Sequence, residues 1–295
     1  MSAAGAGTDE LGAMLAVPCG DREQFDALRS APAFVHHREL LQHITNTRAG
    51  DDVISLDGFC WACSRASMFH LNRRPMFRSE SPVANWRDGL YCERCGMSNR
   101  VRSMCWFTDA AMRGRRRPMI YATERNTAFY EWLAGRYGDS TVGSEFLGED
   151  VAPGTVANGV RHENVEELSF SDAVFDVIVS MDVLEHVNEP RRAIHQLRRV
   201  LKPGGALLFS VPFVNDASRN IRRAELRSGQ LVHHEPPMYH GYPPPGQGWL
   251  VFWDYGWELV DDLRGEFDSV ELVLYQSCQY GNLGPNLSFF RCGRA

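Results

Sequence analysis

The sequence of 295 residues has no apolar run that approaches the roughly 20 residues of a membrane-spanning helix. It has no excess of positive charge either, since the formal net charge is -6 at pH 7, whereas proteins that bind nucleic acid usually carry a basic surface. Residues 1–20 lack a basic segment and include Asp9 and Glu10, which is not the pattern of a secretory signal peptide. We therefore expect a cytoplasmic protein without a membrane or nucleic-acid partner.

Strand-like and helix-like segments alternate in the second part of the chain. Residues 175–181 (FDVIVSM) are almost wholly apolar, as is typical of a strand in a parallel sheet that is covered on both faces. Residues 189–201 have the pattern of a helix, which Lys202-Pro-Gly-Gly205 ends. This alternation predicts an α/β fold with an open, doubly wound sheet. The expected strands are residues 119–123, 141–146, 159–163, 175–181, 206–211, 270–276 and 287–291.

The pattern divides the chain into three regions. Residues 1–50 are expected to form an N-terminal helical segment, and they carry no chemical signal. Residues 51–112 contain five of the eight cysteines, four of them in closely spaced pairs. Residues 113–295 hold the alternating strands and helices, so we expect them to form the α/β domain.

Two Cys-x-x-Cys pairs stand out in the middle region. They are Cys60 with Cys63 and Cys92 with Cys95, separated by residues 64–91. In a reducing compartment, pairs at this spacing indicate a metal site rather than disulfides. Four thiolates complete the tetrahedral coordination of zinc and leave no position for substrate, so the ion would be structural. The alternative is a set of free core cysteines.

A longer motif carries a family resemblance. Residues 175–187 (FDVIVSMDVLEHV) and residues 198–205 (RRVLKPGG) resemble class I S-adenosylmethionine-dependent methyltransferases, in particular the type 11-like subgroup. The resemblance extends over about a fifth of the chain. The cysteine pairs ahead of it are similar to those of a subset of these enzymes that has an N-terminal zinc-binding segment. The resemblance therefore implies S-adenosylmethionine as cofactor and structural Zn²⁺.

The same resemblance implies a particular fold. It is a Rossmann-like seven-stranded methyltransferase sheet with a reversed final strand, preceded by a zinc-ribbon-like segment with four cysteine ligands. Residues 267–291 can supply the last two strands as a hairpin. Residues 113–295 would be the methyltransferase domain, in which residues 214–262 form a substrate-capping insertion.

The resemblance also implies where the cofactor binds, which is at the carboxyl ends of the strands. Glu145 matches the acidic residue that accepts hydrogen bonds from both ribose hydroxyls, since a carboxylate offers two acceptor oxygens. Asn164 is suited to an adenine edge because an amide both donates and accepts. The remaining implied pocket residues are Val165 beside the adenine, and Asp182, Val183 and His186 near the sulfonium. Alternatively, Asp182 caps the next helix and His186 packs under the sheet edge.

The first motif departs from the family. Most members have Gly-x-Gly after the first strand, whereas residues 120–127 (IYATERNT) contain no glycine. Thr123 or Glu124 stands where the family has its acidic residue, and Thr127 is placed to cap the helix and meet the cofactor carboxylate. This departure leaves open a protein that has lost cofactor binding.

A histidine-rich segment follows the fifth strand. Residues 233–241 (HHEPPMYHG) contain three histidines, and histidine is suited to general base catalysis near neutral pH. We predict that His234 or His240 is the general base and that Tyr239 helps to position the substrate. The alternative is a structural loop with local hydrogen bonds.

Together these features predict an S-adenosylmethionine-dependent methyltransferase that acts on oxygen or nitrogen of a small molecule, either a sugar or a secondary metabolite. One alternative is a zinc-ribbon binding module built on an inactive methyltransferase fold. Another is an enzyme that uses the sulfonium for a different alkyl transfer or a cyclisation. The sequence makes no prediction of the acceptor's identity or of the oligomeric state.

Overall fold

The computed structural model describes residues 14–48, 50–72, 84–240 and 248–295. Residues 1–13 of the expected N-terminal segment, residues 73–83 of the cysteine-containing segment and residues 241–247 of the expected insertion lie outside the described residues. The boundaries at 50, 112, 214 and 262 therefore stay predictions. Within the described part, no helix is both long enough and apolar enough to cross a membrane.

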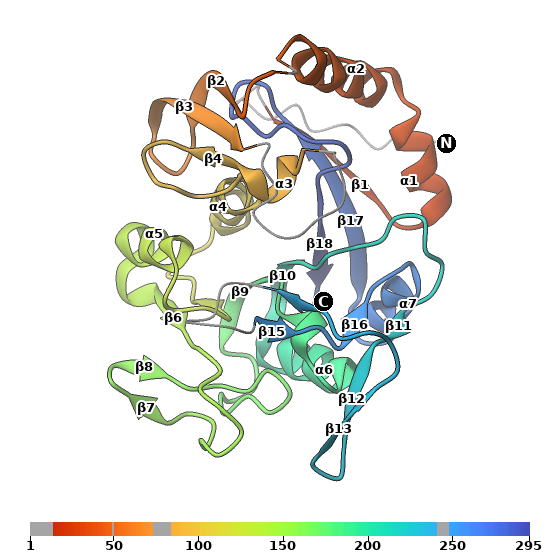
Figure 1. The fold of residues 1–295 in the computed structure, drawn as a ribbon. Coiled ribbons are helices and arrows are strands. Elements are labelled where there is room, and N and C mark those ends of the chain that lie inside the picture. Colours follow the sequence, from red (N-terminus) through yellow and green to blue (C-terminus); the bar gives the residue numbers. More distant parts are fainter. Residues whose placement is uncertain (1–13, 49, 73–83, 241–247) are drawn as a thin grey trace.

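A seven-stranded mixed sheet forms the centre of the molecule (Figure 1). Its order is β1 (Leu15–Cys19), β17 (Ser269–Gln276), β18 (Ser288–Gly293), β10 (Leu201–Ser210), β9 (Phe175–Met181), β5 (Ile120–Ala122) and β6 (Thr141–Gly143). Strands β10, β9, β5 and β6 are parallel, whereas β18 is antiparallel to β10 and to β17. This arrangement confirms the predicted Rossmann-like sheet and its reversed final strand.

Two strands of the sheet differ from the sequence expectation. Residues 15–19 lie in the region expected to be helical, yet they form β1, which pairs antiparallel with β17. The expected strand at 159–163 contributes only one parallel bridge to the sheet, between Glu145 and His162. The reason is local, because His162 gives its N–H to Thr155 and accepts from Gly154. The preceding residues instead form a hairpin of β7 (Val156–Ala157) and β8 (Val160–Arg161).

Helices cover both faces of the sheet, as the apolar β9 sequence predicts. In β9, Ile178 packs in one core cluster while Val177 and Val179 pack in the other. The first cluster includes residues of α1, α6 and α7, and the second includes residues of α4 and α5. The helices are α1 (Arg22–Arg29), α2 (Pro32–Thr47), α3 (Trp86–Gly89), α4 (Asn99–Met112), α5 (Ala128–Tyr137), α6 (Pro190–Val200) and α7 (Glu258–Arg264), with 3₁₀ turns η1 (Gly138–Ser140) and η2 (Leu184–His186).

The cysteine-containing segment forms a small sheet of its own. Strands β2 (Val53–Cys60), β3 (Arg65–Asn72) and β4 (Leu90–Cys92) pair antiparallel. They enclose a separate apolar cluster that includes Phe69 and Leu90, and α4 leads from this segment to the central sheet (Figure 1). The side chain of Arg102 on α4 is buried and donates to the carbonyls of Tyr280 and Gly281. Helix α4 is therefore anchored to the loop between β17 and β18.

The described part of the expected insertion, residues 214–240 and 248–262, contains three pairs of short strands. They are β11 (Ile221–Arg222) with β16 (Trp253–Asp254), β12 (Ala224–Arg227) with β13 (Gln230–His233), and β14 (Tyr239–His240) with β15 (Trp249–Leu250). The peptide N–H of Phe252 donates to the carbonyl of Glu185, which follows β9. This bond ties the insertion to the carboxyl end of the central strand.

Candidate functional site

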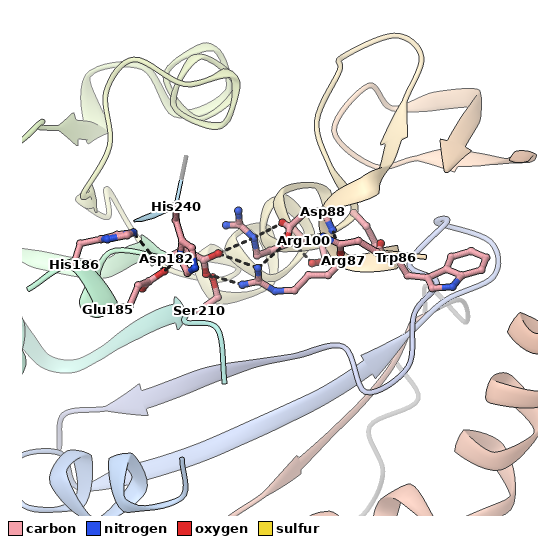
Figure 2. A network of polar contacts seen from close by, with 12 residues as sticks. Trp86, Arg87, Asp88, Arg100, Asp182, Glu185, His186, Ser210 and His240 are labelled. Atoms are coloured by element: carbon pink, nitrogen blue, oxygen red, sulfur yellow. Dashed lines mark hydrogen bonds and ion pairs between the residues drawn. The ribbon is translucent and has the colours of Figure 1, made fainter. Parts of the chain in front are cut away.

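The carboxyl end of β9 carries an ion-pair network that spans two segments of the chain (Figure 2). Asp182 follows β9 directly and has a positive φ of 52°, a conformation that aspartate tolerates better than most residues. Arg87 of α3 donates to both of its carboxylate oxygens, at 2.9 and 2.6 Å. Arg100 of α4 lies 3.4 Å from Oδ2, and the Ser210 hydroxyl donates to Oδ1 at 2.8 Å.

The network fixes the charge of Asp182. Burial alone would raise the pKa of this carboxyl, but the Arg100 and Arg87 charges and the Arg87 and Ser210 hydrogen bonds outweigh it and lower the pKa well below 3.8. Asp182 is therefore an anion at neutral pH, and two arginines from the cysteine-containing segment hold it. The sequence motif identified Asp182, but nothing in the sequence pairs Arg87 with a residue so distant along the chain.

Glu145 organises the loop that follows β5. Its Oε1 accepts from the backbone N–H groups of Arg125 and Asn126 at 2.8 and 2.7 Å. Thr127 caps α5, since its hydroxyl oxygen accepts from the Tyr130 N–H at 3.2 Å. The loop thus has a fixed conformation without glycine, because the Glu145 carboxylate at the end of the neighbouring strand accepts hydrogen bonds from two of its backbone N–H groups.

Glu124 presents a buried acceptor in the same loop. Its Oε1 has no hydrogen-bond partner among the described residues. Burial raises the pKa of Glu124 from 4.5 to about 7, against the lowering effects of a Thr127 hydrogen bond and of Arg100. Thr123, in contrast, donates its hydroxyl to Ser180 at 3.1 Å and so faces β9. Of the two first-motif candidates, Glu124 is therefore the one with unused hydrogen-bonding capacity.

Two further candidates pack against the core cluster that contains residues of α6 and α7. Val165 and Val183 both line a small apolar cavity, together with Leu184 and Ile194. Asn164 makes a local turn, in which its Oδ1 accepts from the Glu166 N–H at 2.9 Å. Its amide nitrogen is the part that this turn leaves for other contacts.

A buried carboxylate flanked by two histidines lies next to Asp182 (Figure 2). Glu185 is 1% exposed, and its Oε1 lies 3.8 Å from His186 Nε2 and 3.8 Å from His240 Nδ1. The structure thus brings together His186 from η2 and His240 from β14. It places His234 elsewhere, 3.4 Å from Glu225 of the β12–β13 hairpin, and it leaves Tyr239 43% exposed.

The four paired cysteines converge at the end of the small sheet. Their sulfurs lie within 4.8 Å of one another, with Cys60 and Cys95 3.9 Å apart and Cys63 and Cys92 3.9 Å apart. Sulfurs around a tetrahedral zinc ion, each about 2.3 Å from the metal, are separated by about 3.8 Å. The backbone N–H of Arg94 points at Cys92 Sγ, at 3.4 Å. The geometry of the cluster is therefore compatible with a zinc ribbon.

Comparison with known proteins identifies the central part of the chain. Residues 126–209 match the family described as a methyltransferase domain. The chain is 35% identical over 79 residues to a probable S-adenosylmethionine-dependent methyltransferase of Mycolicibacterium smegmatis, covering 24% of this chain and 31% of that protein. It is 45% identical over 51 residues to a ubiquinone biosynthesis O-methyltransferase of Alkalilimnicola ehrlichii, covering 17% and 21%. The chain thus spans less than a third of the length of these curated relatives.

Among solved structures, that of DesVI from Streptomyces venezuelae aligns with a TM-score of 0.39 at 16% identity, covering 66% of this chain and 98% of that one. The matched residues 126–209 contain Glu145, Asn164 and the whole of β9. They begin at residue 126, near the end of the glycine-free stretch 120–127, and so leave out Thr123 and Glu124. Residues 126–209 are therefore similar to a methyltransferase domain, and they include strands β6 and β9 of the seven-stranded sheet described above.

Proposed function

We propose that the protein is an S-adenosylmethionine-dependent methyltransferase that methylates oxygen or nitrogen of a small molecule, either a sugar or a secondary metabolite. One observation carries this proposal. Within the matched domain, or beside it, three carboxylates follow neighbouring parallel strands: Glu124 after β5, Glu145 after β6 and Asp182 after β9. The carboxyl ends of parallel strands are where ligands bind in open α/β sheets.

Glu124 in the first loop and Glu145 after β6 suit two different parts of the cofactor. Glu145 uses Oε1 for backbone amides, which leaves Oε2 to accept from ribose hydroxyls. Glu124 has a buried oxygen without a partner, which suits the ammonium group of the methionine end. Thr127 is the third candidate of this loop, at the N-terminus of α5. Asn164 and Val165 would meet the adenine, and Val183 and His186 would line the sulfonium end.

Bound S-adenosylmethionine supplies an electrophilic methyl group on its sulfonium. The protein's part is to align the acceptor with that methyl group and to take a proton when the nucleophile is protonated. Of the two histidines proposed as general base, His240 is the stronger candidate, because it lies beside Glu185 at the carboxyl end of β9, whereas His234 lies beside Glu225 of the β12–β13 hairpin. Tyr239 precedes His240 on β14 and is proposed to contact the acceptor.

A structural zinc ion bound by Cys60, Cys63, Cys92 and Cys95 is the second part of the proposal. The separations between the sulfurs support it, and four thiolates leave no open position for chemistry. The ion would fix the turns that follow β2 and β4. Helix α3, which contains Arg87, directly precedes β4. We infer that its role is to place Arg87 against Asp182.

A binding module without methyl transfer is the second candidate function. The observation that favours it is the saturation of Asp182 by Arg87, Arg100 and Ser210, together with the glycine-free first loop. Calorimetric titration of the zinc-loaded chain with S-adenosylhomocysteine separates the two candidates. We expect binding at micromolar ligand, and absence of binding at millimolar ligand would favour the module. Label transfer from methyl-labelled cofactor to candidate acceptors then tests turnover.

A further inference from the structure

Glu185 is a buried carboxylate whose ion-pair partners among the described residues are two histidines. Neither of its side-chain oxygens has a hydrogen-bond partner among the described residues. The two nearest basic groups, His186 Nε2 and His240 Nδ1, lie 3.8 Å from Oε1, beyond the range of a hydrogen bond. A buried anion in this state is costly unless something pairs with it.

The arginines of the neighbouring network do not provide that partner. Arg87 is bound to Asp182 and Asp88, and Arg100 is bound to the same two carboxylates. Burial raises the pKa of Glu185 and the Asp182 charge adds to the rise, whereas the interactions with His240 and His186 lower it in part. Among the described residues, the ion-pair partners of the Glu185 carboxylate are therefore two imidazoles and no guanidinium group.

The ring of His186 is oriented by a backbone carbonyl. Its Nδ1 lies 2.8 Å from the carbonyl oxygen of Leu250. A carbonyl oxygen only accepts, so Nδ1 carries the proton, and in the neutral ring Nε2 presents its lone pair toward Glu185. Imidazoles that bind metal ions are typically held in this way, by a hydrogen bond from the other ring nitrogen.

The third member of the cluster comes from the other side of the site. His240 lies on β14, and its ring is perpendicular to that of His186, with the centroids 5.6 Å apart. The ligand atoms of Glu185, His186 and His240 all lie within 4.8 Å of one another. Metal–ligand bonds of about 2.0–2.2 Å place adjacent ligand atoms about 3–3.5 Å apart, so a small contraction would close the three groups around one ion.

We propose that Glu185, His186 and His240 form a binding site for a divalent cation of the first transition row. Two imidazoles and one carboxylate are a ligand set for Mn²⁺, Fe²⁺ or Zn²⁺, and three protein ligands leave coordination positions open. The bound ion supplies the positive charge that Glu185 lacks. It also explains why β14 of the insertion is held against the carboxyl end of β9.

The cation site adds a second way to activate an acceptor. A divalent ion with open positions binds an acceptor hydroxyl and lowers its pKa, so it would take over the activating role proposed for the His240 imidazole. This consequence rests on the proposed function, whereas cation binding itself does not. The two claims therefore need separate measurements.

The test is a titration of the zinc-loaded full chain with Mn²⁺, followed by electron paramagnetic resonance. Mn²⁺ is suited to this purpose because four thiolates select softer ions and keep their zinc. We expect one bound Mn²⁺ per chain, and a second equivalent of Zn²⁺ should compete for it. Absence of binding of both Mn²⁺ and a second Zn²⁺ would overturn the proposal.

Variants locate the site. Glu185→Gln and His240→Ala should each weaken Mn²⁺ binding by more than about tenfold, since each removes one of three ligands. His234→Ala is the matched control from the same insertion and should bind Mn²⁺ as the wild type does. Equal binding by His240→Ala and the wild type would place the ion elsewhere and contradict the assignment. His240 is partly exposed, so this variant is expected to fold even if Glu185→Gln does not.

S-adenosylhomocysteine binding, measured on the same samples, keeps the two claims apart. The His240→Ala variant should bind this ligand as the wild type does. A chain that binds Mn²⁺ but no S-adenosylhomocysteine would refute the proposed function and leave the cation site intact. The reverse result would refute the cation site alone.

Discussion

Glu145 and Asp182 both follow strands of the same parallel sheet, but they are held in different ways. Glu145 is held locally, by two backbone amides of the loop that follows the adjacent strand β5. Asp182 is held by Arg87 and Arg100, which belong to the cysteine-containing segment far earlier in the chain. One end of the candidate site is thus built from two neighbouring loops of the central sheet, whereas the other depends on the cysteine-containing segment.

Removal of the proposed zinc ion should produce the largest loss of stability, because it acts on the cysteine-containing segment that holds Asp182. Cys92→Ser should destabilise the chain by more than about 4 kcal/mol, as expected when a structural metal is lost. Zinc content and urea unfolding measure this change. Cys278→Ser is the control, since Cys278 is exposed and outside the cluster, and it should leave both quantities unchanged. A Cys92→Ser chain with full stability would show that no structural ion is bound.

Arg87→Ala tests the ion pair without disturbing the cysteines. The substitution leaves a buried carboxylate with fewer partners, so we expect a loss of about 3 kcal/mol at pH 7. The pKa of Asp182 is lowered in the folded chain, so the stabilisation is present above pH 3.8 and is lost as the pH falls further. Unfolding of both proteins at pH 7 and in acid should therefore show the difference shrinking at low pH.

Arg192→Ala is the matched control for Arg87→Ala. Arg192 forms an exposed ion pair with Glu167, at 3.0 Å, and its loss should cost at most about 1 kcal/mol. If Arg87→Ala lowered the free energy of unfolding no more than this control does, the contact between the two segments would be energetically unimportant. That result would contradict the claim that Asp182 depends on the cysteine-containing segment.

Glu145→Gln tests the end of the site that is held by local backbone amides. The change keeps the size of the side chain but removes the charge that the two amides and the ribose would share, so S-adenosylhomocysteine binding should weaken between about tenfold and a hundredfold. Calorimetry measures the affinity. Glu149→Gln, in the loop beyond β6, should bind as the wild type does, and equal affinities for all three chains would exclude Glu145 from the site.

Glu124 should give the smallest effect and the clearest dependence on pH. Burial raises its pKa to about 7, and the ionised form is the one that would hold the ligand ammonium. Affinity for S-adenosylhomocysteine should therefore rise about tenfold between pH 6 and pH 8, as the ionised fraction rises. Glu124→Gln should show a weaker affinity and a flat profile. An unchanged slope in this variant would assign the titration to another group.

How far the sequence predicts this structure depends on how local each feature is. The β9 strand, the C-terminal hairpin and the cysteine pairs are predicted correctly because a short, continuous sequence pattern identifies each of them. The strand β1 was not predicted, because five residues give no periodic signal and their partner strand lies at the other end of the chain. The third strand was expected in full but is a single bridge, because a nearby turn uses the backbone groups of His162.

The same distinction applies within the site. The family motif pointed to Asp182, Glu145 and Asn164, and the domain match contains all three. Arg87 carries no sequence signal, because its partner is fixed only when the cysteine-containing segment packs against β9. The meeting of His240 with Glu185 and His186 likewise depends on how the insertion folds back.

A crystal structure of the zinc-loaded chain with S-adenosylhomocysteine tests the central claim most directly. The account predicts the ligand at the carboxyl ends of β5, β6 and β9, with the ribose hydroxyls on Glu145 and the ammonium group near Glu124. A ligand bound elsewhere, or none at saturating concentration, would contradict it.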